Sequence, residues 1–283
     1  EMRHGVHSMT KTLSGGLSML YLAERYGDAV FDTLVTDVVP EAAAIPGWQG
    51  VTLEHVLNMV TGTAGEDAGS SSFLFRPDSS WQTLEFIAGL GDAAPAPGTT
   101  FSYATTHTFV LSFAMQRLVE AREGAGVRYW DLVQRDVLDP IGVFDFPIQT
   151  SLERGGDTPV PTLGVGAFPT ADDIAKIVQL YLDEGAHNGV QLLHRGRTLE
   201  ATNKTAWPGY AVTNFTSYQH SFWLYSVTSP SRGCSYKAST MQGFGANYAI
   251  LLPSGIAAIR LTDNEEYDIA PMIRAAEEIR PSC

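Results

Sequence analysis

The chain has 283 residues, of which 44% are hydrophobic and 17% are charged, and its formal net charge at pH 7 is −13. This composition is typical of a globular protein and excludes disordered, collagen-like and coiled-coil chains. The acidic balance and the lack of a Lys- or Arg-rich run argue against nucleic acids and anionic membrane surfaces as main partners, and no apolar run is long enough to span a bilayer.

The first half of the chain has mostly helical patterning. Apolar residues at helical spacing predict a helix over residues 8–25, and Gly15 and Gly16 inside it indicate that another backbone packs close to it. The same spacing predicts further helices over residues 51–60, 80–90, 106–122 and 129–138.

The second half mixes helices with strands. A capping box at residues 170–173 predicts the start of a helix that Gly185 ends. Runs of β-branched and aromatic residues predict strands, the last two joined as a hairpin, and a closing helix follows; these elements are expected over residues 221–227, 247–252, 256–261 and 268–279. The order predicts an α+β fold in which helices flank an antiparallel sheet. We expect a sheet-containing part at residues 1–35 and 150–283, and an all-helical part at residues 36–149.

The two cysteines, Cys234 and Cys283, allow at most one internal disulfide. The sequence allows two alternatives, a pair of buried thiols or a Cys234–Cys283 bridge. The bridge would indicate an oxidising compartment, so that the protein would be secreted or periplasmic. Neither cysteine stands in a C-x-x-C pattern, and the seven histidines lack a metal-binding spacing. We therefore expect no metal and no cofactor.

A serine and a lysine stand three residues apart at the start of the first predicted helix. Side chains at i and i+3 share a helix face, so Ser8 and Lys11 can meet. Free N–H groups at a helix start favour negative charge, and a lysine that desolvation keeps neutral can take a serine proton. The same S-x-x-K spacing also occurs as an N-cap serine followed by a solvated lysine, so the spacing alone does not decide between the two.

The segment H-S-M-T-K-T-L-S-G-G at residues 7–16 resembles the nucleophile helix of the serine β-lactamase and penicillin-binding-protein superfamily. The resemblance is strongest to its class C-like esterase and amide-hydrolase branch, which includes 6-aminohexanoate-dimer hydrolases. Similar segments follow in the family's order: V-T-L-E-H-V-L-N-M-V-T-G at 51–62, P-G-T-T-F-S-Y-A-T at 97–105, D-P-I-G-V at 139–143, G-A-F-P-T-A-D-D-I-A at 166–175 and M-Q-G-F-G at 241–245. Each match is weak alone, and their shared order makes them jointly specific.

The resemblance implies a β-lactamase/transpeptidase-like fold and catalysis through an acyl-enzyme. Ser8 would be the nucleophile, and Lys11 and Tyr103 would move the protons, although the sequence does not decide which of the two is the general base. The backbone N–H groups of Ser8 and Phe244 would form the oxyanion hole. Gly243 would let the strand come close to the substrate.

Further residues are candidates for binding substrate. Gln242 and Thr105 join Gly243 in this role through their places in the matching segments, and Trp223 joins them as an aromatic residue of a predicted strand. Aromatic residues in or after the predicted strands could line an apolar pocket, although aromatics in strands more often form core; they are Phe222, Trp223, Tyr225 and Phe244.

Two departures from the family pattern bear on the substrate, and a third bears on the sheet. Met241 and Gln242 stand where relatives often have Lys, His or Trp, so recognition of a substrate carboxylate is in doubt. In an alternative register, residues 237–239 would match the family's K-T-G motif instead. Thr105 replaces the usual Asn after the tyrosine, as in nylon-oligomer amide hydrolases and related esterases. The family has a helix and two strands before its nucleophile, so we expect those strands to be missing, or an N-terminal fragment or a homo-oligomer to complete the sheet.

The sequence therefore predicts a serine hydrolase whose partner is a small ester or amide substrate. Two alternatives stay open. One is a β-lactamase or D-amino-acid peptidase, and the other is a catalytically silent relative that serves as a binding or scaffold protein.

Overall fold

The computed structural model describes residues 2–63, 79–90, 95–153, 155–229 and 232–283. Within these residues, the main sheet has six antiparallel strands that neighbour one another in chain order. The strands are β3 (Tyr210–Ala211), β4 (Thr216–Gln219), β5 (Phe222–Thr228), β6 (Ser235–Gly243), β7 (Asn247–Leu251) and β8 (Ala257–Arg260). A separate hairpin pairs β1 (Ala186–His187) with β2 (Val190–Gln191).

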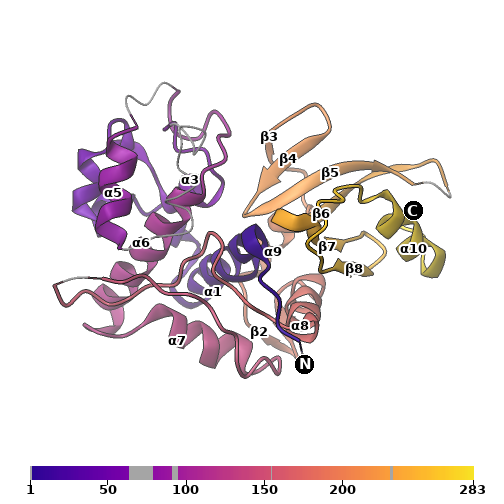
Figure 1. The fold of residues 1–283 in the computed structure, drawn as a ribbon, viewed down its shortest axis with the longest axis horizontal. Coiled ribbons are helices and arrows are strands. Elements are labelled where there is room, and N and C mark those ends of the chain that lie inside the picture. The colour runs from indigo at the N-terminus through magenta and orange to yellow at the C-terminus, as the bar shows by residue number, and fades with distance from the viewer. Residues whose placement is uncertain (1, 64–78, 91–94, 154, 230–231) are drawn as a thin grey trace.

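Helices lie on both sides of the sheet, with α1 and α8 on one side and α10 on the other (Figure 1). The helices α3, α5, α6 and α7 gather at the end of the molecule that lies away from α10. The α-helices are α1 (Leu17–Tyr26), α2 (Val35–Val38), α3 (Leu53–Leu57), α5 (Ser80–Ala88), α6 (Thr105–Glu123), α7 (Tyr129–Val133), α8 (Ala171–Leu182), α9 (Arg195–Ala201) and α10 (Ala270–Ile279). The 3₁₀ and π segments are η1 (His7–Met9), η2 (Lys11–Gly16), η3 (Asp28–Val30), η4 (Pro40–Ala44), η5 (Trp48–Gly50), η6 (Gln134–Leu138) and η7 (Phe244–Ala246).

The predicted α+β fold is confirmed, and most predicted elements lie near their expected limits. The capping box at the start of α8 is present, with reciprocal hydrogen bonds between Thr170 and Asp173. The helix expected over residues 51–60 is shorter, because Met59 takes a left-handed conformation (φ 57°) that ends it. Sequence patterning missed α9 and β4, whose short polar runs carry little periodicity.

The helix predicted over residues 8–25 is found, but it consists of η1, the π-helical η2 and α1 in succession. The carbonyl of Thr12 in η2 accepts a hydrogen bond from Tyr181 Oη at 3.2 Å, and Thr12 Oγ1 donates to the Ser221 carbonyl at 2.6 Å. A Cβ on Gly16 would lie 3.0 Å from the His220 carbonyl oxygen. The expected close approach of another backbone is therefore confirmed, and that backbone is the β4–β5 turn.

The sheet buries both of its faces. Successive side chains of a strand point to opposite faces, so Phe222 and Leu224 of β5 pack in the large core with α1 and α8. Residues of the other face pack beneath α10, where Tyr248 and Ile250 of β7 meet Ile273. For Phe222 the sequence left pocket and core open, and its fully buried side chain forms core.

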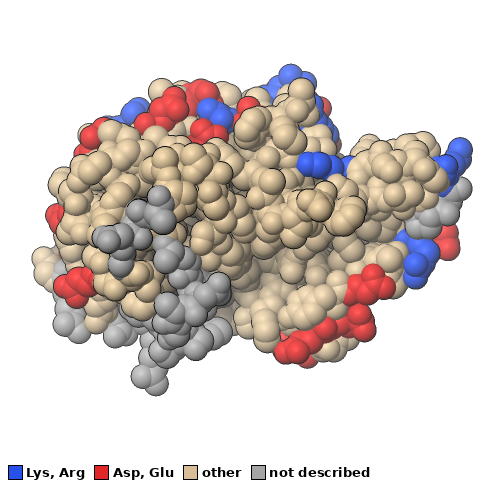
Figure 2. All heavy atoms as spheres, turned by 90° about the horizontal axis from the view of Figure 1, so that it is seen from above, with Lys and Arg blue, Asp and Glu red and all other residues tan. Residues whose placement is uncertain are grey.

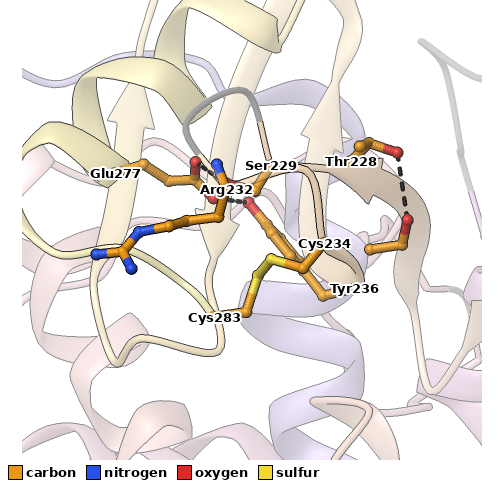
Figure 3. Close-up of a disulfide and its surroundings, with 8 residues drawn as sticks. Thr228, Ser229, Arg232, Cys234, Tyr236, Glu277 and Cys283 are labelled. Atoms are coloured by element: carbon orange, nitrogen blue, oxygen red, sulfur yellow. Dashed lines mark hydrogen bonds between the residues drawn. A yellow bond between two sulfur atoms is a disulfide. The ribbon is translucent and has the colours of Figure 1, made fainter.

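A disulfide joins Cys234, just before β6, to Cys283 at the chain end after α10 (Figure 3). Beside it, the buried carboxylate of Glu277 in α10 accepts hydrogen bonds from Ser229 Oγ at 2.6 Å and Tyr236 Oη at 2.8 Å. The bridge and this carboxylate fix α10 on the sheet. Of the two alternatives for the cysteines, the disulfide is the one found, which is consistent with an extracellular protein. Among the described helices, none has the length and hydropathy to cross a membrane.

His107 in α6 gives the fold a pH-dependent stability. Its ring is fully buried, packs edge-on against Trp48, and has Nδ1 3.3 Å from Thr61 Oγ1. Burial lowers its pKa to about 3. Because an unfolded histidine titrates near pH 6.5, the unfolded state binds more protons than the native state between these two values, and stability falls as the pH falls through that window.

We expect the free energy of unfolding to fall between pH 6.5 and 5 with a slope that approaches about 1.4 kcal/mol per pH unit at the lower end from this one proton. Urea unfolding at several pH values in this range measures the slope, before most carboxylates titrate. The His107→Asn variant should lose this contribution, whereas His187→Asn, on the partly exposed β1, should keep it. An unchanged slope in His107→Asn would contradict the assignment.

Candidate active site

Ser8 and Lys11 meet at the start of the first helical segment. Lys11 Nζ donates to Ser8 Oγ at 2.9 Å and to the Gly164 carbonyl at 2.9 Å. The lysine is only 2% exposed, and no salt bridge to it is present among the described residues. This lysine is therefore a buried amine that faces a serine hydroxyl, and the solvated N-cap arrangement that the spacing also allowed is not found.

The turn that carries Ser8 is strained and tightly packed. His7 has a left-handed backbone (φ 48°), and the N–H of Met9 bonds to the Val6 carbonyl at 3.1 Å. Such conformations in non-glycine residues cluster at functional sites. A Cβ on Gly243 of β6 would lie only 2.1 Å from the Val6 oxygen, so glycine is needed for β6 to pass this turn. The close approach expected at Gly243 is thus made to the Val6 carbonyl, while Gly243 also lines the cavity described below.

The second hydrogen-bond partner of Lys11 is the carbonyl of Gly164, a residue that the sequence analysis did not identify. A Cβ on Gly164 would lie 2.3 Å from Thr105 Cγ2, so glycine lets this loop close onto the start of α6 and bring its carbonyl to the lysine. Thr105 itself is 2% exposed and is absent from the described lining of the cavity. The structure therefore places Thr105 behind the site, where it packs against the loop that holds Lys11.

Tyr103 reaches the same place from the loop before α6. Lys11 Nζ lies 4.9 Å from the centroid of its ring, within the range of a cation–π contact. The ring also stacks on Trp223 of β5, with centroids 5.6 Å apart and planes at 26°. The fold thus brings Ser8, Lys11 and Tyr103 together from two distant stretches of the chain.

Ser8 and Tyr103 open onto a cavity of about 260 Å³, which we call the proximal cavity. Its lining consists of Ser8, Tyr103, Trp223, Gln242, Gly243, Phe244 and Tyr267. No Lys, Arg, Asp or Glu is part of this described lining. Gln242 is held by a hydrogen bond from the Tyr225 hydroxyl. Sequence analysis did not identify Tyr267, which lies in a polar stretch after β8 without any periodic pattern.

The electrostatics around the proximal cavity are set by histidine and carboxylates. Burial lowers the pKa of His7, while Asp263 acts in the opposite direction. Asp263 belongs to the exposed stretch of residues 263–268, which supplies Tyr267 to the cavity and also carries Glu265, Glu266 and Asp268. Figure 2 shows a broad, largely uncharged area on one face of the molecule, with both acidic and basic side chains at its edges.

The alternative register, with Lys237 near the site, does not fit the structure. Lys237 Nζ donates to the Pro208 carbonyl at 2.7 Å and to Ser217 Oγ at 2.8 Å, and it is not part of the described lining of the proximal cavity. Met241 is fully buried in the core, whereas its neighbour Gln242 lines the cavity. The register that places residues 241–245 beside the serine is therefore the one that the fold adopts.

An antiparallel sheet with helices on both faces, and a Ser–Lys–Tyr cluster between its β6 strand and a helical region, defines a protein of the β-lactamase and transpeptidase fold. The sequence matches the family model described as Beta-lactamase over residues 1–280, and the chain belongs to this family. The resemblance stated from the sequence is thereby confirmed.

Solved structures with the same fold include hydrolases and penicillin-binding-protein homologues. The octameric penicillin-binding protein homologue from Pyrococcus abyssi has a TM-score of 0.67 and 17% identity, over 99% of this chain and 66% of its own. A candidate 6-aminohexanoate-dimer hydrolase from Bacillus anthracis has a TM-score of 0.67 and 18% identity, over 98% of this chain and 71% of its own. EstCE1, a hydrolase with promiscuous acyltransferase activity, has a TM-score of 0.70 and 16% identity, over 98% and 84%.

The chain thus spans only 66% of the length of the Pyrococcus abyssi protein. Identities of this size show a shared fold and do not transfer an activity. A comparison with curated proteins gave no match.

Proposed function

We propose that the protein is a serine hydrolase that cleaves small neutral esters or amides through an acyl-enzyme intermediate. The observation that carries the proposal is the 2.9 Å contact between the buried Lys11 amine and Ser8 Oγ at the edge of the proximal cavity. A nucleophile and a base within hydrogen-bond reach are the signature of an activated serine.

In the proposed reaction, Ser8 Oγ attacks the substrate carbonyl carbon while its proton passes to Lys11 Nζ. Lys11 Nζ lies 2.9 Å from Ser8 Oγ, so it is placed to accept this proton. The backbone N–H groups of Ser8 and Phe244 hold the developing oxyanion. The proton then passes to the departing alcohol or amine, directly from Lys11 or through Tyr103. Water repeats the attack on the acyl-enzyme and releases the carboxylic acid, and Ser8 regains its proton.

The charge distribution favours neutral substrates over the alternative of a β-lactamase or D-amino-acid peptidase. Recognition of a substrate carboxylate needs a cation near the scissile bond, and the described lining of the proximal cavity has none. The acidic stretch 263–268 at its edge repels anions further. The preformed Ser8–Lys11 contact likewise favours catalysis over a silent scaffold.

A substrate comparison tests the proposal. We expect kcat/KM for a neutral p-nitrophenyl ester to exceed that for an anionic chromogenic cephalosporin by roughly ten- to a hundredfold, the worth of one missing charge-assisted hydrogen bond. The Gln242→Lys variant, which adds a cation to the lining, should narrow this ratio. Faster turnover of the cephalosporin would favour the β-lactamase alternative, and turnover of neither would favour the scaffold.

A further inference from the structure

A second cavity, of about 270 Å³, lies beside the proximal cavity, and we call it the distal chamber. It is lined by Tyr225, Ser226, Val227, Thr228, Asp268, Ile269, Ala270 and Ile273. Its floor is the second half of β5, and its roof is the start of α10 with the residues that precede it.

The two cavities share a continuous floor and a continuous roof. Trp223, Tyr225 and Val227 point to the same face of β5 because side chains alternate along a strand. Trp223 lines the proximal cavity, whereas Tyr225 and Val227 line the distal chamber. In the roof, Tyr267 lines the proximal cavity and its chain neighbours, residues 268–270, line the distal chamber.

The linings of the two cavities meet at a pair of side chains. The Tyr225 hydroxyl donates to the Gln242 side-chain oxygen, so one residue of each cavity's lining meets the other there. A substrate whose carbonyl is bound at Ser8, and whose chain extends past Trp223, would run along β5 and over this pair. The path from Trp223 to Val227 covers roughly 13 Å of an extended strand.

The distal chamber is suited to hydrocarbon. Its lining includes the partly buried Val227 in the floor and Ile269 in the roof, with the buried Ile273 behind them. The one carboxylate in the lining, Asp268, is directed to the N–H of Ala270 at the start of α10, at 2.9 Å. Val227 and Ile269 pack against the cluster beneath α10, so the chamber lies at the edge of this contact between β5 and α10.

We propose that the distal chamber binds an apolar arm of the substrate, so that the preferred substrates are esters or amides with an unbranched chain of roughly eight to ten carbons, the length that spans this path. This inference rests on the proposed function, because it assigns the arm of a substrate whose carbonyl lies at Ser8. The occupant is part of the substrate itself, since the lining of the chamber meets the lining of the cavity that holds Ser8 at the Tyr225–Gln242 contact.

A chain-length series tests the inference. For p-nitrophenyl esters from acetate to decanoate, we expect kcat/KM to rise roughly two- to fourfold for each methylene that enters the chamber, in line with the burial of hydrocarbon. A parallel series of acetate esters of longer alcohols shows which side of the scissile bond carries the arm, and a rise in either series supports the inference. A flat response in both series overturns it.

A substitution that fills the distal chamber provides the structural control. In Val227→Trp, the added ring occupies the distal chamber, and the ratio of kcat/KM for the favoured long-chain ester to that for p-nitrophenyl acetate should fall at least tenfold relative to the wild type. In the matched variant Val190→Trp, on the 59% exposed Val190 of β2, the ratio should stay at the wild-type value. An unchanged ratio in Val227→Trp overturns the inference.

A measurement on the unaltered protein makes the test independent of how the variant folds. We expect 1-decanol to inhibit acetate ester hydrolysis competitively with an inhibition constant at least tenfold lower than that of 1-butanol, and equal constants would overturn the inference. If the acetate ester is not hydrolysed at all, the proposed function itself fails. If it is hydrolysed without any preference for longer chains, only the distal chamber assignment fails.

Discussion

Replacement of Ser8 by alanine should reduce kcat/KM for a neutral ester by at least about a thousandfold, because the variant has no oxygen to form the acyl-enzyme. Loss of the nucleophile in a serine hydrolase removes nearly all of the rate that the catalytic groups supply together. The same variant should no longer react with a fluorophosphonate probe, which we expect to label Ser8 of the wild type covalently. Ester assays and the intact mass of the protein after labelling measure the two effects.

Ser14→Ala is the matched control for this experiment. Ser14 lies in η2, the segment that follows the η1 turn of Ser8, and it is fully buried but is not part of the described lining of the proximal cavity. We expect the control to keep both labelling and turnover. Labelling that persists in Ser8→Ala at the wild-type rate would show that the reacting serine lies elsewhere, and an unlabelled but folded wild type would support the scaffold alternative.

Lys11→Met should lower kcat by roughly a hundred- to ten-thousandfold, the usual contribution of a general base. Methionine keeps most of the length and apolar character of the buried side chain but removes the nitrogen that donates to Ser8 and Gly164. Among the described residues, Ser8 Oγ receives a hydrogen bond from Lys11 and none from Tyr103. We therefore expect the Lys11 variant to lose more activity than Tyr103→Phe.

Lys11→Arg separates two roles of the amine. An arginine keeps the positive charge but does not give up its proton in proteins. If Lys11 acts as a base, Lys11→Arg should be as inactive as Lys11→Met. Activity within tenfold of the wild type in Lys11→Arg would show that the residue supplies only charge, and would transfer the role of base to Tyr103. Unfolding midpoints of all three variants establish that the comparison is made on folded protein.

Much of this fold could be predicted from sequence because its long elements carry strong periodicity or caps. The helices α6 and α8 and the strands β5 and β7 are examples, each close to its predicted limits. The π-helical segment at residues 11–16 could not be predicted, because its residues have ordinary helical spacing. The irregular turn is accompanied by contacts of Thr12 with Tyr181 and Ser221, which are distant in sequence.

The site was predictable where it depends on local spacing and not where it depends on distant contacts. The Ser8–Lys11 contact follows from two positions on one helix face. By contrast, Gly164 can offer its carbonyl to Lys11 only because its loop approaches α6 closely. Tyr267 lines the cavity only because its loop covers this part of the sheet. Thr105 was expected in the binding site from its place beside Tyr103, but the first turn of α6 directs it into the interior.

The six strands of the main sheet pair in the order in which they occur along the chain, so the sheet forms through contacts between near neighbours. The proximal cavity has the opposite property, because it joins Ser8 at one end of the chain to Tyr103 in the middle and Tyr267 near the other end. Bringing such remote segments together is the entropically slow part of folding. Recovery of enzymatic turnover after dilution from denaturant therefore reports the completion of folding, whereas circular dichroism of the sheet reports an earlier stage.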